Sequence, residues 1–84
     1  MKNQIDVEII SVEGYLFQGQ AHQVVVPTVE GNIGVMPEHE FLVSELREGK
    51  IEILDLNDNI LKDIEVKTGT VEIHDGGLRI LVDS

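Results

Sequence analysis

The sequence contains no cysteine, which excludes disulfides and thiolate metal sites. A chain of 84 residues buries only about 60 to 65% of the surface that its unfolded form exposes. A domain of this size therefore depends on its hydrophobic core, on a binding partner, or on both. No repeat, low-complexity tract or linker divides the chain, so the sequence predicts one domain over residues 1–84.

Basic residues are few. Six Lys and Arg stand against 16 Asp and Glu, and the formal net charge is −10. Such a chain repels phosphate backbones and has no basic patch for anionic lipids. The composition therefore argues against nucleic acid as a partner.

Long apolar runs are also missing. No stretch approaches the ~20 apolar residues that a membrane-spanning helix needs. Residues 1–6 lack the basic flank and the apolar run of a signal peptide. We therefore expect a soluble, cytoplasmic chain without membrane insertion, which reaches a membrane only through another protein.

The sequence does contain a two-residue hydrophobic period. Ile5, Val7 and Ile9 alternate along the first segment, which is typical of a strand with one buried face. Further runs rich in β-branched, aromatic or alternating apolar residues cover 15–17, 23–27, 50–56, 60–67, 71–74 and 79–82. These short strands predict an all-β fold, a single antiparallel β-sandwich or flattened barrel.

Turn residues separate these runs. Asn57-Asp58-Asn59 and Asp75-Gly76-Gly77 predict tight hairpins. Gly19 is expected to form a turn or bulge between the second and third strands. Residues 38–46 are expected to form an irregular loop that leads into a strand.

A nucleotide site is not complete in this sequence. Glu48-Gly49-Lys50 is the nearest approach to a P-loop, but Ile51 stands where Ser or Thr should hold the metal. Ser44 stands where the first glycine should be. We therefore interpret Gly49 as a hairpin residue that needs a positive φ.

Metal and catalytic motifs are equally incomplete. Asp55, Asn57 and Asn59 have the spacing of a calcium loop, but its essential Gly and Glu are missing. The three histidines are too far apart for a short-spaced zinc motif, and no serine lies in a nucleophile motif. The residues alone thus predict a small acidic sandwich without a catalytic centre, metal or cofactor.

A more specific pattern lies in the middle of the chain. It reads Val24-Val25-Val26-Pro27, then Glu30-Gly31-Asn32-Ile33-Gly34-Val35-Met36-Pro37, then His39. This order resembles the signature of the ATP synthase epsilon subunit, where an apolar strand precedes Glu-Gly-x-Leu/Ile-Gly-Ile/Val, a Pro and a His. Segments 12–19, 46–53, 69–73 and 78–83 are similar to further segments of that family, in the same order.

The resemblance implies the sandwich domain of a bacterial rotary ATP synthase subunit. Such a subunit is a non-catalytic part of the central stalk, joining the gamma subunit to the c-ring and coupling proton transport to ATP synthesis. It would lie peripherally on the cytoplasmic face of the bacterial inner membrane. Most family members continue past the equivalent of Asp83 into a helical hairpin, which is absent from this sequence.

The resemblance also implies two sets of contact residues. Those expected near the c-ring are Glu30, Gly31, Asn32, His39 and Glu40. Those expected toward the gamma subunit are Ser11, Phe41, Leu42 and Val43. For the last three, burial in the core is the alternative interpretation, whereas exposure would favour an interface.

Two other functions stay open at this point. A nucleotide-sensing regulator would need the helices that the family carries after the sandwich. A free-standing acidic sandwich that binds a small ligand or metal would need a deep pocket with convergent polar groups.

Overall fold

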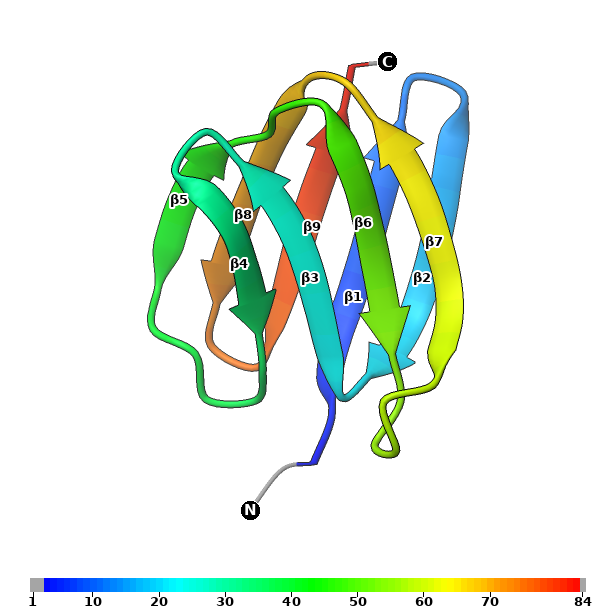
Figure 1. The fold of residues 1–84 in the computed structure, drawn as a ribbon, viewed down its shortest axis with the longest axis vertical. Helices are drawn as coiled ribbons and strands as arrows, with labels where there is room; N and C mark the ends of the chain where they lie inside the picture. Colours follow the sequence, from blue (N-terminus) through cyan, green and yellow to red (C-terminus); the bar gives the residue numbers. More distant parts are fainter. Residues whose placement is uncertain (1–2, 84) are drawn as a thin grey trace.

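The computed structural model describes residues 3–83, and every regular element in that range is a β-strand (Figure 1). The strands are β1 (Ile5–Ser11), β2 (Gly14–Ala21), β3 (Gln23–Thr28), β4 (Gly31–Val35), β5 (Leu42–Glu45), β6 (Gly49–Leu54), β7 (Ile60–Val66), β8 (Gly69–His74) and β9 (Gly77–Val82). Within residues 38–46, residues 38–41 form a loop that leads into β5, as predicted. The predicted all-β class is confirmed.

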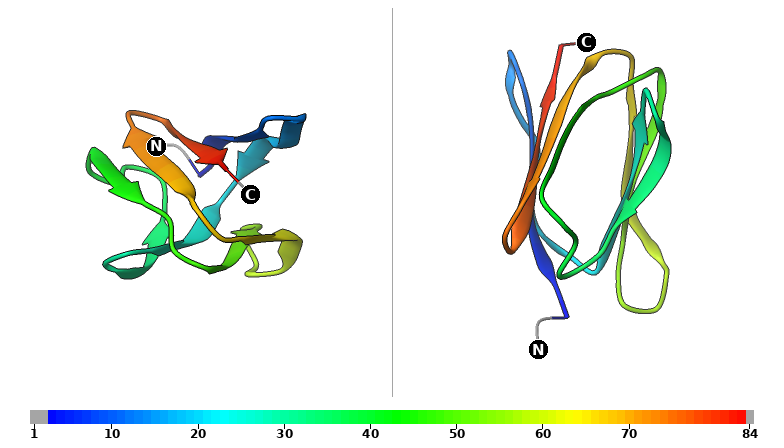
Figure 2. Two further views of the ribbon diagram at one scale, coloured as in Figure 1. Left: turned by 90° about the horizontal axis from the view of Figure 1, so that it is seen from above. Right: turned by 90° about the vertical axis from the view of Figure 1, so that its left-hand side faces the viewer.

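The strands form two sheets that face each other, as the views in Figure 2 show. The orders are β2-β1-β9-β8-β5 and β4-β3-β6-β7. This confirms the predicted sandwich, but the expectation of antiparallel pairing throughout was wrong at one place. β1 and β9 run parallel, with Asp6 opposite Gly77 and Ile10 opposite Leu81. Parallel strands are never joined by a tight turn, so no local turn signal could reveal this pair.

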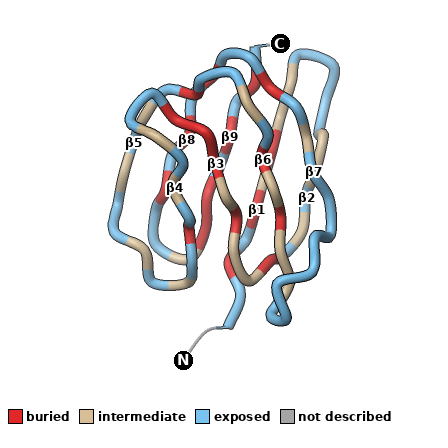
Figure 3. The backbone as a smooth tube through the Cα atoms, in the orientation of Figure 1, coloured by how far each residue is buried: buried red, intermediate tan, exposed pale blue. Residues whose placement is uncertain are grey.

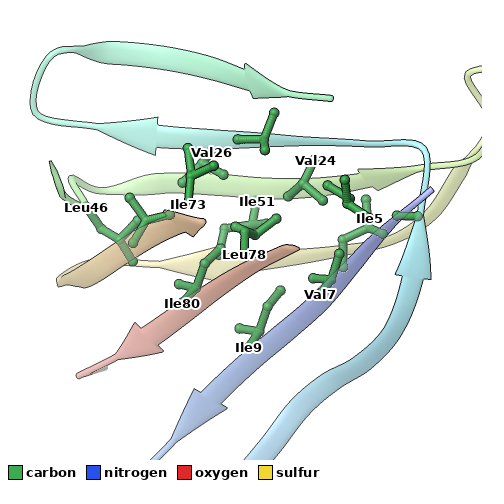
Figure 4. Packing of buried hydrophobic residues seen from close by; sticks show 14 of the residues in the cluster. Ile5, Val7, Ile9, Val24, Val26, Leu46, Ile51, Ile73, Leu78 and Ile80 are labelled. Carbon is green, nitrogen blue, oxygen red and sulfur yellow. The ribbon is translucent and has the colours of Figure 1, made fainter. Parts of the chain in front are cut away.

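The core lies between the sheets and consists almost entirely of Ile, Val and Leu. Figure 3 shows buried residues alternating along the strands, and Figure 4 shows their side chains meeting between the sheets. Fully buried large side chains include Ile9, Ile51, Ile53, Ile73, Leu78 and Ile80. Burying each contributes about 1.5–3 kcal/mol. The core thus supplies the stability that a disulfide would give other small domains.

One corner of the sandwich is closed by main-chain bonds. Where the chain crosses between the sheets, Leu46 forms an isolated antiparallel bridge with Thr28. Beside it, the Val29 N–H donates to the Glu45 carbonyl oxygen over 3.0 Å. These bonds join the end of β3 to the end of β5, so the structure approaches a flattened barrel at this corner.

The opposite side, between β2 and β7, is joined by a side chain. Lys62 lies opposite the buried Ile53 in the β6–β7 register, and its Nζ donates to the Leu16 carbonyl oxygen over 3.1 Å. The ammonium group of Lys62 thus bonds the other sheet. Within residues 3–83, no main-chain bridge links these two strands.

Two glycines have roles other than those expected. Gly19 does not form a turn or bulge but lies inside β2, opposite Val7, and the chain reverses at His22. Gly49 does not have a positive φ, and instead begins β6 where a Cβ would come within 2.9 Å of the Pro27 Cβ. Close packing, which the sequence does not display, is therefore the reason for glycine at position 49.

Asp55 holds the predicted hairpin between β6 and β7. Its Oδ1 accepts the N–H groups of Asn57 and Asn59, both over 2.9 Å, and Asp58 at the tip has a φ of 65°. Hydrogen bonds to the ionised carboxylate, chiefly from Asn59, lower the pKa of Asp55.

Asp55→Asn should lower the thermal midpoint Tm at neutral pH, because an amide oxygen is a weaker acceptor than a carboxylate. The folded-state pKa lies below the unfolded value, so the contribution is complete above about pH 4 and is lost as the pH falls through the folded-state pKa. The difference in Tm between wild type and variant should therefore close on acidification. Asp58→Asn in the same turn is the control, and a difference that persists in acid would contradict this assignment.

Gly69 begins β8 with a φ of 152°. A Cβ at this position would collide with the carbonyl oxygen of Leu81 and approach the Leu46 Cδ1 to 3.0 Å. Gly14 also has a positive φ, 124°, but a Cβ there would meet nothing within 4 Å. Glycine is therefore required at position 69 for both steric and conformational reasons, and at position 14 for a conformational reason alone.

Gly69→Ala should lower the free energy of unfolding by about 3 kcal/mol or more, since it adds overpacking to backbone strain. Gly14→Ala should cost only about 1–2 kcal/mol, the strain alone. Urea unfolding of both variants measures the difference. Equal losses would show that the collision at Gly69 is relieved without cost.

Candidate functional site

The connections between strands gather at two ends of the sandwich. Because β1 and β9 are parallel and the other pairs antiparallel, four connections share one end with residue 83. We call it the upper end, as it lies uppermost in Figure 1, and it comprises residues 12–13, 29–30, 46–48, 67–68 and 83. The lower end comprises residues 22, 36–41, 55–59 and 75–76.

The residues expected near the c-ring do not lie together. Glu30 forms part of the β3–β4 turn, and Gly31 and Asn32 begin β4, all at the upper end. His39 and Glu40 follow β4 at the lower end. The five residues of β4 span about 16 Å at 3.3 Å per residue. A single flat contact surface at either end therefore includes one group and not the other.

The residues expected toward the gamma subunit are also divided. Ser11 ends β1 at the upper end, whereas Phe41, Leu42 and Val43 lie where β5 begins, at the edge of the five-stranded sheet. Phe41 is 75% exposed and Val43 is 57% exposed, while Leu42 is partly buried and packs against the core. Core burial thus accounts for Leu42, but it does not account for the other two.

The loop before β5 has a defined shape. Glu38 has a φ of 73°, and the His39 N–H donates to the Met36 carbonyl oxygen over 3.1 Å. The His39 Nδ1 lies 2.7 Å from the Glu40 carbonyl oxygen. Because a carbonyl oxygen only accepts, Nδ1 carries the proton in this contact. These bonds fix the loop that presents Phe41.

Two turns at the upper end repeat the same sequence pattern and the same bonds. Residues 11–14 read Ser-Val-Glu-Gly, and residues 28–31 read Thr-Val-Glu-Gly. In each turn the hydroxyl accepts the Glu N–H over 3.1 Å and donates to the Gly carbonyl oxygen, over 3.2 Å from Ser11 and 2.7 Å from Thr28. This repeat was not among the features predicted from the sequence, although the recurring Ser/Thr-Val-Glu-Gly pattern was a sufficient signal for it.

Thr28→Val should lower the free energy of unfolding by about 1–3 kcal/mol, because the buried Thr28 hydroxyl has two main-chain partners that would lose their bonds. Ser11→Ala, in the exposed copy of the turn, should cost about 1 kcal/mol or less. Chemical unfolding of both variants tests the expected order, and a larger loss from Ser11→Ala would contradict it.

Catalytic chemistry is not visible in the part of the chain that the structure describes. No group of three His, Asp or Glu residues there could hold a metal ion. The segment that partly resembles a P-loop forms β5, β6 and the crossing between them. The surface hollow at the upper end, about 470 Å³, is shallow and is lined by Glu48, Gly49, Lys50, Glu65, Val66 and Lys67. Among the described residues there is also no helix that could cross a membrane.

The fold defines a class, a small two-sheet β-sandwich with exposed apolar side chains at one sheet edge and at its turns. Residues 4–84 match the family model described as the beta-sandwich domain of the ATP synthase delta/epsilon chain. The chain belongs to this family.

Curated relatives are similar over nearly the whole chain. The ATP synthase epsilon chain 2 of Burkholderia orbicola is 32% identical over 83 residues, which cover 99% of this chain and 55% of that protein. The epsilon chain of Leptospira borgpetersenii is 37% identical over 81 residues, which cover 96% of this chain and 62% of the relative. The chain therefore spans little more than half the length of these relatives.

Solved structures share the fold. One chain of the Euglena gracilis mitochondrial ATP synthase, in a structure of OSCP, F1 and c-ring, has a TM-score of 0.88 at 21% identity. The match covers 100% of this chain and 53% of that one. A chain from the central stalk and c-ring of the Tetrahymena thermophila mitochondrial ATP synthase has a TM-score of 0.76 at 16% identity, covering 99% of this chain and 66% of that one.

Proposed function

We propose that this chain is a non-catalytic rotor subunit of an ATP synthase, which joins the gamma subunit to the c-ring and couples proton transport to ATP synthesis. The observation that carries the proposal is its similarity to epsilon chains over nearly its full length. The two solved structures with this fold also come from c-ring assemblies, one of them a central stalk. By this proposal the chain lies peripherally on the cytoplasmic face of a bacterial inner membrane.

The sandwich suits a rotor joint for a mechanical reason. Main-chain ladders join its strands within two packed sheets, and its interior is filled with branched aliphatic side chains. Such a body transmits torque with little deformation. This function needs no bond chemistry and no cofactor.

We assign the gamma contact to the edge formed by Phe41 and β5. Phe41 and Val43 expose apolar surface there, and the bonded loop before them holds Phe41 in place. His39 and Glu40 lie in the same loop, so they join this surface in our proposal. Aromatic side chains such as Phe are enriched at the core of protein interfaces.

We assign the c-ring contact to the upper end, through Glu30, Gly31 and Asn32. Gly31 closes the β3–β4 turn with a φ of 116°, and Asn32 is exposed beside it. The Glu30 carboxylate would meet basic side chains of the ring, which steers assembly more than it adds affinity. The two partners would then bind at different ends of the domain.

Phe41→Ser and Val43→Ser should each weaken binding to the recombinant gamma subunit by about tenfold or more, since each takes an apolar side chain out of the buried part of the complex. Isothermal titration calorimetry measures the change. Leu56→Ser is the matched control, because Leu56 is 61% exposed on the hairpin between β6 and β7. Unchanged affinity in both variants would contradict this surface, and no binding of the wild type at tens of micromolar would contradict the proposed function.

The alternative of a small-ligand sandwich has little support. Hollows on the described surface are shallow, and the one at the upper end is lined by side chains of both charges without a convergent polar cluster. A nucleotide-sensing regulator would depend on helices after the sandwich, and no feature of the described strands favours it.

A further inference from the structure

The repeated turns of the upper end point to a partner that is itself repeated. Their shared features extend from sequence to geometry, because the hydroxyl bonds match and the closing glycines have φ values of 124° and 116°. One turn joins β1 to β2 in the five-stranded sheet, and the other joins β3 to β4 in the four-stranded sheet. The domain thus presents the same structural element twice at one end.

The valines at the tips of these turns are exposed and do not belong to the hydrophobic core. Val12 is 91% exposed and Val29 is 55% exposed. Tight turns usually carry Gly, Pro, Asn, Asp or Ser at such positions. A rigid turn that displays an apolar side chain loses little conformational entropy on binding, so this arrangement favours contact with a partner.

Each valine is followed by a glutamate that is available to a partner. Within residues 3–83, the ion pairs are Lys50 with Asp63 and Arg79 with Glu8, so neither Glu13 nor Glu30 takes part in one. Each turn therefore offers one apolar side chain and one carboxylate. A matching site would combine an apolar notch with a basic side chain.

The two turns also lie close enough to act together. The domain measures 34 × 22 × 20 Å, and its long axis runs vertically in Figure 1, so the upper end is at most 22 × 20 Å in cross-section. Two equivalent turns within that cross-section suit a surface on which the same site recurs at a similar spacing. A ring of identical subunits is such a surface.

We infer that the upper end binds two neighbouring copies of one repeated subunit, with the turn at 11–14 on one copy and the turn at 28–31 on the next. The inference rests on the proposed function, in which this end faces the ring. It assigns Ser11, Val12 and Glu13 to the ring contact and removes Ser11 from the gamma contact. Binding through two linked sites raises affinity beyond that of either site alone.

Cross-linking tests the inference directly, because the chain has no cysteine of its own. Val12→Cys and Val29→Cys, labelled with a benzophenone maleimide and irradiated with the detergent-solubilised c-ring of the cognate synthase, should each give an adduct of one chain with one ring subunit. The double variant should give an adduct with two ring subunits, visible by mass. Leu56→Cys, exposed at the lower end, is the control and should give none.

Affinity for the ring gives a second readout. Val12→Ser and Val29→Ser should each weaken binding about tenfold, and the double variant about a hundredfold, because each substitution replaces an apolar side chain that the ring would bury. Binding to the gamma subunit should be unchanged in all three. Both valines are exposed, so the variants should fold normally.

Two results would overturn the inference while leaving the proposed function intact. One is an effect of position 29 without an effect of position 12, and the other is a double variant that captures only one ring subunit. Failure of the wild type to bind either the ring or the gamma subunit would reject the proposed function and this inference with it.

Discussion

The parallel pairing of β1 with β9 is the constraint on which the rest of the structure depends. β2 reaches the five-stranded sheet only through β1, and β1 reaches it only through β9. The pairing buries the inner side chains of the first and last strands against the other sheet, including Ile9 and Ile80, which lie opposite each other in the ladder. Together with the antiparallel pairs of both sheets, it decides which connections share an end.

That distribution of connections separates the candidate surfaces. Glu30 and His39 are only nine positions apart in the sequence, but β4 carries the chain from one end to the other between them. Ser11 and Glu30 are much further apart in the sequence, but they lie at the same end because their hairpins point in the same direction. In the function that we propose, residues that are close in the sequence can therefore contact different partners, because each partner binds a different end of the sandwich.

The sequence was informative wherever the cause of a structure was local. The alternation of Ile5, Val7 and Ile9 predicted β1, and the turn residues at 57–59 and 75–77 predicted two hairpins, because side-chain period and turn chemistry act over a few residues. It was not informative for the β1–β9 pair, which joins distant segments. The predictions for Gly19 and Gly49 were wrong, because a glycine in the sequence can mark a turn, a position inside a strand or a site of close packing. The sequence indicated which segments hold the candidate contact residues. It did not indicate that these segments lie at two different ends, because that depends on the strand topology.

The two sides of the sandwich are joined unequally, so the sheets should separate more easily on one side than on the other. Under a twisting load, the corner with the Thr28–Leu46 bridge resists separation through main-chain bonds. Among the described residues, the side between β2 and β7 resists through the Lys62 bond to Leu16 and through side-chain packing on the core. The two sheets would therefore separate first along the Lys62 side, with the bridged corner acting as the hinge. In the rotor role that we propose, the domain would therefore be stiffer along the bridged corner than along the Lys62 side.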